Sequence, residues 1–283
     1  MKTAGAPISW GICEVPGWGR QLDRDRVLEE MRDLGLTATE LGPEGFLPPS
    51  PARRKAMLDR YGLTAVGGFL PVVLHEPAHD PLPAMRARMR DFAEGGVEMM
   101  VLAADSDTEG YDRRPELTAS GWKTLLRNLD RIAADAAGFG RKVSLHPHIG
   151  TMIEHSAEVD RVLSGSSVPL CLDTGHLLIG GTDPAELVRR NTARIAHVHL
   201  KDVDADIAAK VRAGDLTYTQ AVRQGIYRPL GQGDVDIEGI VARLRQSGYD
   251  GWYVMEQDVA LTSEAATPAE DVRTSLAYLN GLS

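Results

Sequence analysis

The sequence predicts a single α/β domain, a (β/α)₈ barrel over residues 1–283, for three reasons. Short apolar runs alternate with amphipathic stretches, which is the pattern of βα units around a parallel sheet. Eight such units fit into 283 residues, and no Pro/Ser-rich linker divides them. No G-x-G-x-x-G or G-K-[ST] motif follows the first expected strand, which disfavours the runner-up architecture, a doubly wound sheet.

Each expected strand is a short run rich in β-branched or other apolar residues. In chain order the expected strands are Ile8–Cys13, Ala38–Leu41, Ala65–Leu70, Met99–Ala103, Val143–His146, Leu170–Asp173, Ile195–Lys201 and Trp252–Glu256. The expected helices between them are Asp23–Leu34, Pro51–Tyr61, Pro83–Gly95, Leu117–Gly138, Ala157–Ser164, Pro184–Asn191, Ile237–Ser247 and Pro268–Leu279. Capping residues such as Asp183 and Asp236 start helices, and glycines such as Gly35 and Gly248 end them.

The longest connection follows the seventh expected strand, from about Val203 to Gly233. It contains two helical segments, Asp206–Ala213 and Tyr218–Gln224. Long βα loops of a barrel lie at its catalytic face and often act as lids, so we expect a lid-like insertion here. The alternative is a surface decoration without a role in the site.

Composition excludes several classes of protein. A hydrophobic content of 43% allows a large core, and no run of 18 apolar residues indicates a membrane span. The net charge of −9 disfavours nucleic acid as a partner and favours a small uncharged or anionic metabolite. Two cysteines form no disulfide framework, and the start of the chain has no secretory pattern, so we expect a cytoplasmic protein.

Histidines and carboxylates gather at the predicted strand ends. Five of the eight histidines lie at or beside predicted strand ends between positions 146 and 199, namely His146, His148, His176, His197 and His199. The carboxyl ends of the strands converge on one mouth in a barrel, so residues far apart in sequence meet there. Period-two alternation turns His197, His199 and Lys201 to the inside of the seventh strand. Asp173 ends the sixth strand, and Glu256 ends the eighth.

These residues predict a divalent metal site at the mouth. Neighbouring buried carboxylates repel each other, and a cation removes that cost. The predicted ligands are one histidine of the fifth strand (His146 or His148), Asp173, His199 and Glu256. Carboxylate oxygen and neutral imidazole suit Mn²⁺, Co²⁺, Fe²⁺ or Zn²⁺, and the absence of thiolate disfavours a structural zinc site. For each carboxylate the alternative is a helix cap or an arginine partner.

Three further side chains are candidates for proton transfer. Lys201 lies two positions beyond His199 on the same face, where a nearby cation and low-dielectric walls would disfavour its ammonium form and make it a proton acceptor. Its alternative is a surface ion pair with a following aspartate. His148 is a second acid/base candidate, and we expect His176 to face the substrate. His197 lies one layer deeper and is expected to support the site by a hydrogen bond.

At these residues the chain resembles the xylose-isomerase-like TIM-barrel superfamily of sugar isomerases, epimerases and dehydratases, and within it the inosose dehydratase (2-keto-myo-inositol dehydratase) family. The resemblance covers nearly the whole chain. Its motifs are Ala6-Pro7-Ile8-Ser9-Trp10-Gly11, Thr39-Glu40-Leu41-Gly42, His146-Pro147-His148-Ile149-Gly150-Thr151, Asp173-Thr174-Gly175-His176, His197-Val198-His199-Leu200-Lys201-Asp202, Gly231-Gln232-Gly233-Asp234-Val235-Asp236 and Gly251-Trp252-Tyr253-Val254-Met255-Glu256-Gln257-Asp258.

The resemblance implies a TIM barrel and a metal-dependent lyase that removes water from a cyclic polyol ketone through a metal-stabilised enolate. Most of the superfamily has a glutamate where this chain has His146, and the histidine version is similar to the inosose dehydratase branch. Mn²⁺ or Co²⁺ is the expected ion ahead of Mg²⁺, Fe²⁺ and Zn²⁺. Glu40 is expected to bind a substrate hydroxyl, with a structural cap as its alternative. A homo-oligomer is compatible with this interpretation.

Other functions share these features. A ketose isomerase or epimerase would use the same enolate chemistry without loss of water. A divergent apurinic endonuclease has a related fold, but the negative net charge and the lack of a basic stripe count against it. A non-catalytic sugar-binding barrel would not require Lys201 beside a metal site.

Overall fold

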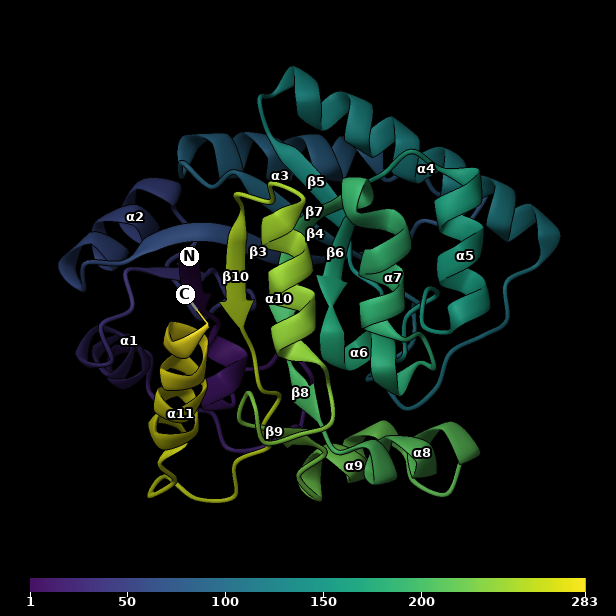
Figure 1. Cartoon of the computed structure of the whole chain (residues 1–283). Coiled ribbons are helices and arrows are strands. Elements are labelled where there is room, and N and C mark those ends of the chain that lie inside the picture. Colours follow the sequence, from purple (N-terminus) through teal and green to yellow (C-terminus); the bar gives the residue numbers. More distant parts are fainter. Residues whose placement is uncertain (283) are drawn as a thin grey trace.

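The computed structural model describes residues 1–282, and eight strands of this range close into a parallel barrel. Around the barrel the order is β1, β10, β7, β6, β5, β4, β3 and β2, so the first strand pairs with the last. The barrel strands are β1 (Lys2–Gly5), β2 (Ala38–Glu40), β3 (Thr64–Val72), β4 (Met99–Ala104), β5 (Lys142–Leu145), β6 (Leu170–Asp173), β7 (Ile195–Leu200) and β10 (Trp252–Met255). Helices surround them (Figure 1), and the predicted fold class is confirmed.

The helices around the barrel follow the amphipathic stretches of the sequence. They are α1 (Arg24–Asp33), α2 (Pro51–Arg60), α3 (Leu82–Glu94), α4 (Ala119–Gly138), α5 (Ser156–Gly165), α7 (Pro184–Asn191), α10 (Ile237–Gln246) and α11 (Pro268–Gly281), with a short 3₁₀ turn, η2 (Thr192–Arg194), after α7. The Asp183 side chain accepts hydrogen bonds from two backbone N–H groups of α7, as expected of a cap. No helix within residues 1–282 is both long and apolar enough to cross a membrane.

The expected position of the first strand, Ile8–Cys13, was wrong. The strand lies earlier, at Lys2–Gly5, and Pro7–Trp10 forms a 3₁₀ turn, η1, in its place. Pro7 has no N–H to give to a central strand, and Gly11 closes the turn with a φ of 76°, which favours glycine. The turn is useful to the barrel, because the Ser9 hydroxyl accepts a hydrogen bond of 3.0 Å from the backbone N–H of Gln257, just beyond β10.

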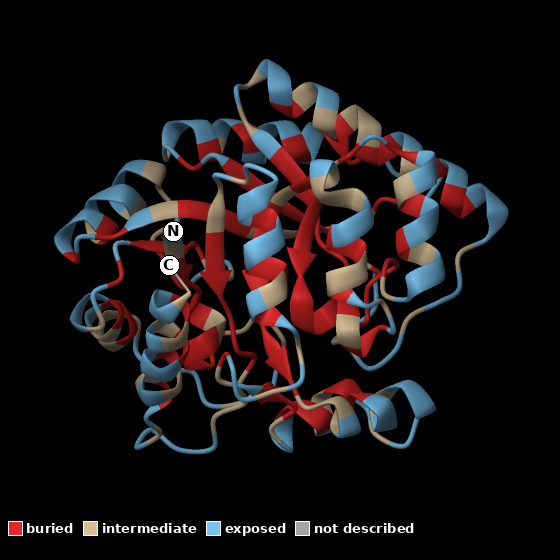
Figure 2. Cartoon of the chain, in the orientation of Figure 1, coloured by how far each residue is buried: buried red, intermediate tan, exposed pale blue. Residues whose placement is uncertain are grey.

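Alternation along each strand separates two environments. Leu172 and Val198 point outward and pack in the main core with helix residues such as Leu244. Cys171 points inward with Met99 and fills the lower part of the barrel. Figure 2 shows the strands buried and the outer helix faces exposed. The polar residues at the strand ends therefore rest on an apolar floor.

A helix that was not predicted begins where β6 ends. Asp173 is the last residue of β6 and caps α6 (Thr174–Ile179), since its Oδ1 accepts a hydrogen bond of 2.7 Å from the backbone N–H of His176. The helix has only six residues and ends at its C-cap, Gly180. The side chain of His176 is thereby fixed close to Asp173.

The long connection after β7 forms a small unit beside the carboxyl ends of the barrel strands (Figure 1). It contains a two-stranded antiparallel sheet and two helices, namely β8 (Asp202–Val203), α8 (Ala205–Ala213), α9 (Tyr218–Arg223) and β9 (Tyr227–Arg228). Buried Asp202 anchors the return of the chain, because its Oδ2 accepts hydrogen bonds of 2.8 and 2.9 Å from the backbone N–H groups of Gly231 and Gly233. We call residues 202–233 the insertion.

Candidate active site

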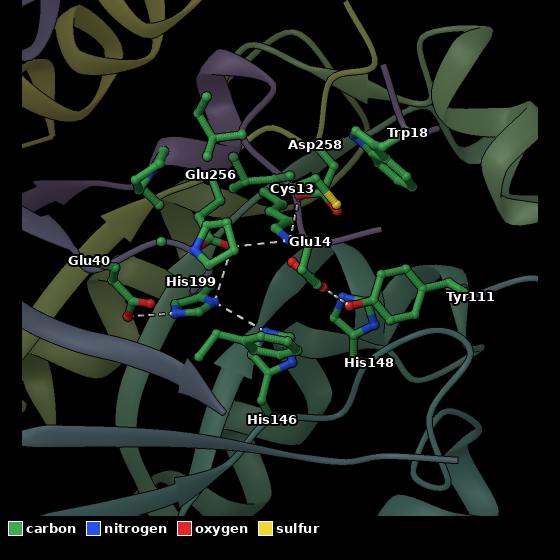
Figure 3. A pocket seen from close by; sticks show the side chains of 18 residues that line it. Cys13, Glu14, Trp18, Glu40, Tyr111, His146, His148, His199, Glu256 and Asp258 are labelled. Carbon is green, nitrogen blue, oxygen red and sulfur yellow. Dashed lines mark hydrogen bonds and ion pairs between the residues drawn. The ribbon is translucent and has the colours of Figure 1, made fainter. Parts of the chain in front are cut away.

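A pocket lies at the carboxyl ends of the barrel strands (Figure 3). Its polar lining combines carboxylates, imidazoles and one lysine, and its apolar lining includes three aromatic rings. The lining residues with chemical groups of interest are Cys13, Glu14, Trp18, Glu40, Phe69, Tyr111, His146, His148, His199, Lys201, Glu256 and Asp258.

Side chains from four consecutive barrel strands meet at the base of this pocket. His146 Nε2, just after β5, lies 3.2 Å from Asp173 Oδ2 and 3.1 Å from His199 Nδ1. His199 Nδ1 lies 3.2 Å from Glu256 Oε2, just after β10. The strand register explains the meeting, because Asp173 of β6 pairs with His199 of β7 and both point inward. We call His146, Asp173, His199 and Glu256 the four-donor cluster.

Both carboxylates of the four-donor cluster are held in the ionised form. Burial by itself raises the pKa of Asp173, but Lys201, His176 and neighbouring imidazoles outweigh it and hold that pKa well below its ordinary value. Burial also raises the pKa of Glu256, and His199 and Lys201 reverse the shift. Two negative charges therefore lie at the base of the pocket at neutral pH.

The donor chemistry of this cluster fits a divalent metal ion. Asp173, His199 and Glu256 each offer a ligand atom, and these atoms lie within 4.8 Å of one another. His146 Nε2 and His199 Nδ1 face each other at 3.1 Å, so at most one proton fits between them, and a shared cation would remove that conflict. Carboxylate oxygen with imidazole nitrogen suits Mn²⁺, Co²⁺, Fe²⁺ or Zn²⁺.

The two histidines after β5 have different environments. His146 faces Asp173 and His199, whereas His148 packs between the rings of Tyr111 and His176, with centroid distances of 4.4 and 3.8 Å. The geometry therefore favours His146 as the member of the four-donor cluster. Period-two alternation put both on one side, and it could not tell these positions apart.

A thiol lies closer to the cluster than the sequence indicated. Cys171 precedes Asp173 by two positions on β6, and its Sγ lies within 4.8 Å of ligand atoms of His146 and His199. Burial raises the pKa of this thiol to about 11. Without a bound cation the thiol is therefore protonated at neutral pH, and the prediction from the sequence did not place a cysteine this close to the donor atoms.

Glu40 lies on the opposite wall and contacts two histidines. Its Oε1 accepts hydrogen bonds from His197 Nε2 at 2.7 Å and from His199 Nε2 at 3.0 Å. Burial would raise the pKa of Glu40, but the two imidazoles hold it well below its ordinary value. Gly67 leaves room for this carboxylate, since a Cβ there would lie 2.8 Å from Glu40 Oε1. Glu40 lines the pocket, but its Oε1 is already occupied by the hydrogen bonds from the two histidines.

Lys201 reaches into the pocket above the four-donor cluster. Its Nζ lies 2.8 Å from Asp258 Oδ1, 3.1 Å from Glu256 Oε2 and 3.3 Å from Asp173 Oδ2. Burial lowers the pKa of Lys201, but these three carboxylates outweigh it and raise that pKa well above its ordinary value. The expectation of a proton acceptor counted a nearby cation and did not include Asp258, the carboxylate closest to Lys201 Nζ.

His148 and His176 stack on each other but differ in access. His148 lines the pocket, whereas His176 is buried behind it with its Nε2 3.0 Å from Lys201 Nζ. Burial lowers the pKa of both rings well below the ordinary value. His148 Nδ1 donates a hydrogen bond of 2.7 Å to the carbonyl oxygen of Ile149, so its proton is on Nδ1 and Nε2 is unprotonated in the neutral ring.

Several residues of the site were not predicted. Asp258 follows Glu256 by two positions, so the same alternation that selected Glu256 could have found it. Tyr218 and Tyr227 come from the insertion, where the Tyr218 hydroxyl donates to Asp258 and lies 2.9 Å from the hydroxyl of Tyr227. No periodicity reveals the path of such a loop, so these tyrosines had no signal in the sequence.

Glu14 and Tyr111 form a second pair at the mouth of the pocket that was not predicted. The Tyr111 hydroxyl donates a short hydrogen bond to Glu14 Oε1 (Figure 3). The two residues come from the loops after η1 and β4. Gly150 permits the close passage of the Tyr111 backbone, because a Cβ at Gly150 would lie 2.5 Å from Tyr111 Cα.

Comparison with known proteins agrees with this architecture. The model of the family described as "Xylose isomerase-like TIM barrel" matches residues 28–282. The chain is 36% identical to the rhizopine catabolism protein MocC of Rhizobium meliloti over 267 residues, which cover 91% of this chain and 82% of that protein. It is 34% identical to the inosose dehydratase of Geobacillus kaustophilus over 266 residues, covering 89% and 86% of the two chains.

Solved structures share the same fold at lower sequence identity. The crystal structure of the IOLI protein with a bound zinc atom superposes with a TM-score of 0.72 at 14% identity, and the match covers 100% of this chain and 98% of that chain. At this identity the likeness concerns the barrel and its connections.

Proposed function

The chain belongs to the xylose isomerase-like TIM barrel family, and we propose that it is a metal-dependent lyase that removes water from a cyclic polyol ketone, 2-keto-myo-inositol or a close analogue. The observation that carries the proposal is the four-donor cluster with Lys201 and His148 directly beside it. The similarity to inosose dehydratases over about nine-tenths of the chain supports the substrate class.

In this proposal the four-donor cluster holds the metal, with Mn²⁺ or Co²⁺ as the preferred ion. A divalent ion there would withdraw electron density from a ketone oxygen and make the neighbouring C–H more acidic. His146 takes the place of a carboxylate, so the ion keeps more of its positive charge than it would with three carboxylate ligands. All other steps belong to side chains of the chain itself.

His148 is the proposed proton acceptor. Its Nδ1–H is committed to the carbonyl oxygen of Ile149, which leaves the Nε2 lone pair for a substrate C–H. Tyr111 and His176 hold the ring between them, so its orientation is fixed before substrate arrives. When His148 takes the proton, the electron pair of the C–H bond remains on carbon, next to the ketone.

Lys201 is the proposed proton donor. Its ammonium group has three N–H donors and is held by Asp258, Glu256 and His176. As the C–O bond to the β-hydroxyl breaks, the electron pair forms a carbon–carbon double bond and Lys201 supplies a proton to the departing oxygen. The products are water and an enol that rearranges to a dione.

The test is a direct assay of the purified protein with Mn²⁺ and 2-keto-myo-inositol. We expect an absorbance increase from the dione, and a product whose mass is lower than that of the substrate by one water. An epimerase or isomerase would instead exchange hydrogen at carbon without this loss of mass. That outcome, or no reaction with any divalent ion, would overturn the proposal.

A paired substitution tests the two proton-transfer roles. His148→Gln is expected to stop hydrogen exchange at the substrate carbon, because no acceptor remains for the C–H proton. Lys201→Met keeps a side chain of similar length but removes the proton donor, so hydrogen exchange should continue while the loss of water slows. If Lys201→Met stops exchange and His148→Gln does not, the two roles are reversed.

A further inference from the structure

Five buried side chains close a ring of contacts behind the pocket. The ring runs from Asp258 to Tyr218, Tyr227, His176 and Lys201 and returns to Asp258. Tyr218 Oη donates to Asp258 Oδ2 at 2.6 Å, and the hydroxyls of Tyr218 and Tyr227 are 2.9 Å apart. Tyr227 Oη lies 3.4 Å from His176 Nδ1. Lys201 Nζ closes the ring at 3.0 Å from His176 Nε2 and 2.8 Å from Asp258 Oδ1.

Each tyrosine hydroxyl carries a single proton, so the hydrogen bonds from Asp258 through the two tyrosines to His176 must all run in one direction. Asp258 Oδ1 faces the ammonium group of Lys201 at 2.8 Å, and Asp258 Oδ2 accepts the hydroxyl proton of Tyr218. The hydroxyl oxygen of Tyr218 is then the acceptor for the proton of Tyr227. With its own proton so used, Tyr227 can only accept from His176 Nδ1.

The position of Lys201 leads independently to the same tautomer of His176, with the proton on Nδ1. An ammonium group only donates, and Lys201 Nζ lies 3.0 Å from His176 Nε2. A proton on Nε2 would set two donors against each other, whereas an unprotonated Nε2 accepts. His176 Nε2 also lies 3.5 Å from Asp258 Oδ2, a longer separation than its contact with Lys201.

We propose that Tyr218 and Tyr227 of the insertion are positioning residues, which hold His176 in its Nδ1–H tautomer so that Nε2 fixes the ammonium group of Lys201 at the edge of the pocket. In this proposal the insertion supplies two side chains that support the catalytic machinery. The role of Lys201 in this statement rests on the proposed function, whereas the tautomer does not.

The local fold provides space for this ring. A Cβ at Gly175 would lie 2.7 Å from Lys201 Cβ and 2.9 Å from Tyr227 Cε1, so only glycine lets α6, β7 and the insertion approach this closely. The ring of Tyr227 also lies under Lys201, with Nζ 5.5 Å from its centroid. Three separate parts of the chain are therefore fitted to one ammonium group.

The first test reads the tautomer without any turnover. Two-bond ¹H–¹⁵N correlation spectra of histidine-labelled protein, loaded with the diamagnetic ion Zn²⁺, distinguish Nδ1–H from Nε2–H rings. A His176→Gln variant assigns the signal. We expect wild-type His176 to show a protonated Nδ1 and an unprotonated Nε2, and Tyr227→Phe to shift it toward a tautomer mixture, because Nδ1–H then loses its acceptor.

The second test compares three tyrosine-to-phenylalanine variants. Tyr218→Phe and Tyr227→Phe should each lower kcat about 10- to 100-fold with little change in KM, because Lys201 is displaced from the reacting hydroxyl. Tyr253→Phe is the matched control, since its hydroxyl is buried, has no hydrogen-bond partner within residues 1–282 and lies outside the ring. Metal content by elemental analysis should be unchanged in all three.

The two readouts separate failure of this inference from failure of the proposed function. An Nε2–H tautomer for His176 in the wild type would overturn the inference whatever the substrate is. Equal kcat values for Tyr218→Phe, Tyr227→Phe and Tyr253→Phe would also overturn it. If 2-keto-myo-inositol is not turned over but the Nδ1–H tautomer is observed and depends on Tyr227, the assignment of substrate fails and the positioning role is retained.

Discussion

Glu40 and His199 share a hydrogen bond that decides which nitrogen of His199 faces the pocket. Glu40 Oε1 accepts from His199 Nε2 at 3.0 Å, and Nδ1 is thereby turned toward Glu256 Oε2 at 3.2 Å. A carboxylate that fixes a histidine in this way raises the basicity of the other ring nitrogen. Glu40 therefore has a positioning role in the structure beyond the hydroxyl-binding role expected from its place in the sequence.

Substitution of Glu40 by glutamine is expected to weaken Mn²⁺ binding about 10- to 100-fold, because an amide oxygen orients His199 less strongly than a carboxylate. Isothermal titration with Mn²⁺ measures the affinity. Glu44→Gln is the matched control, since Glu44 is an exposed carboxylate that pairs with Arg88 at 2.8 Å. Equal Mn²⁺ affinities for Glu40→Gln and the wild type would contradict the positioning role.

Gly67→Ala is expected to weaken the same metal site by displacing Glu40. A Cβ at Gly67 would lie 2.8 Å from Glu40 Oε1, so the carboxylate must move away from His199. Gly68→Ala is a matched comparison on the outer face of β3, where a Cβ would lie 3.0 Å from the ring of Phe92. Both variants should lose about 1–3 kcal/mol in the free energy of unfolding. Only Gly67→Ala should lower Mn²⁺ affinity, and equal affinities in the two variants would refute the link.

Asp173→Asn separates the proposed ligand role of Asp173 from its role as a helix cap. Asparagine caps helices as well as aspartate does, so α6 should persist, as measured by circular dichroism. The charge that binds the ion is lost, and elemental analysis after dialysis should find most of the metal gone. Asp183→Asn makes the same change at the cap of α7 and should retain full metal content. Wild-type metal content in Asp173→Asn would remove Asp173 from the ligand set.

Asp130 on α4 is expected to make stability depend on pH at a place far from the pocket. Burial is the largest single influence and would raise its pKa, but hydrogen bonds from Ser166 and Ser167 together outweigh it and lower the pKa of Asp130. The unfolded chain therefore binds this proton at a higher pH than the folded chain. The contribution of Asp130 to stability is complete above the unfolded pKa and is lost as the pH falls through the folded pKa.

Urea unfolding of Asp130→Asn measures this contribution. The loss of unfolding free energy relative to the wild type should be largest near neutral pH and should decrease as the pH falls below about 4, the ordinary pKa of an aspartate. Asp160→Asn makes the same substitution on the exposed face of α5 and serves as the matched control. A loss in Asp130→Asn that is constant with pH would show that the carboxylate charge is not involved.

The sequence was most informative where alternation along a strand is strict. His146, Asp173 and Glu256 each end a predicted strand, His199 lies near the end of another, and the closed barrel brings their side chains together. Geometry alone places inward residues of neighbouring parallel strands side by side, so the meeting point followed from the strand assignments.

The rest depended on contacts that have no sequence period. The strand at Lys2–Gly5 is short and was replaced in the prediction by the more apolar Ile8–Cys13, where Pro7 and Gly11 in fact form a turn. The tyrosines of the insertion reach His176 through a loop whose path is set by tertiary contacts such as those of Asp202. The ion pairs of Lys201 include one with Asp258, which lies two positions beyond the expected strand Trp252–Glu256.

The seam of the barrel imposes an order on synthesis. The amino-terminal strand β1 pairs with β2 on one side and with β10 on the other, so the wall that carries Glu40 cannot meet the wall that carries Glu256 until β10 has left the ribosome. A growing polypeptide therefore lacks one of the four proposed ligands until about residue 256 has emerged. All four proposed ligands can therefore hold an ion together only after translation has passed residue 256.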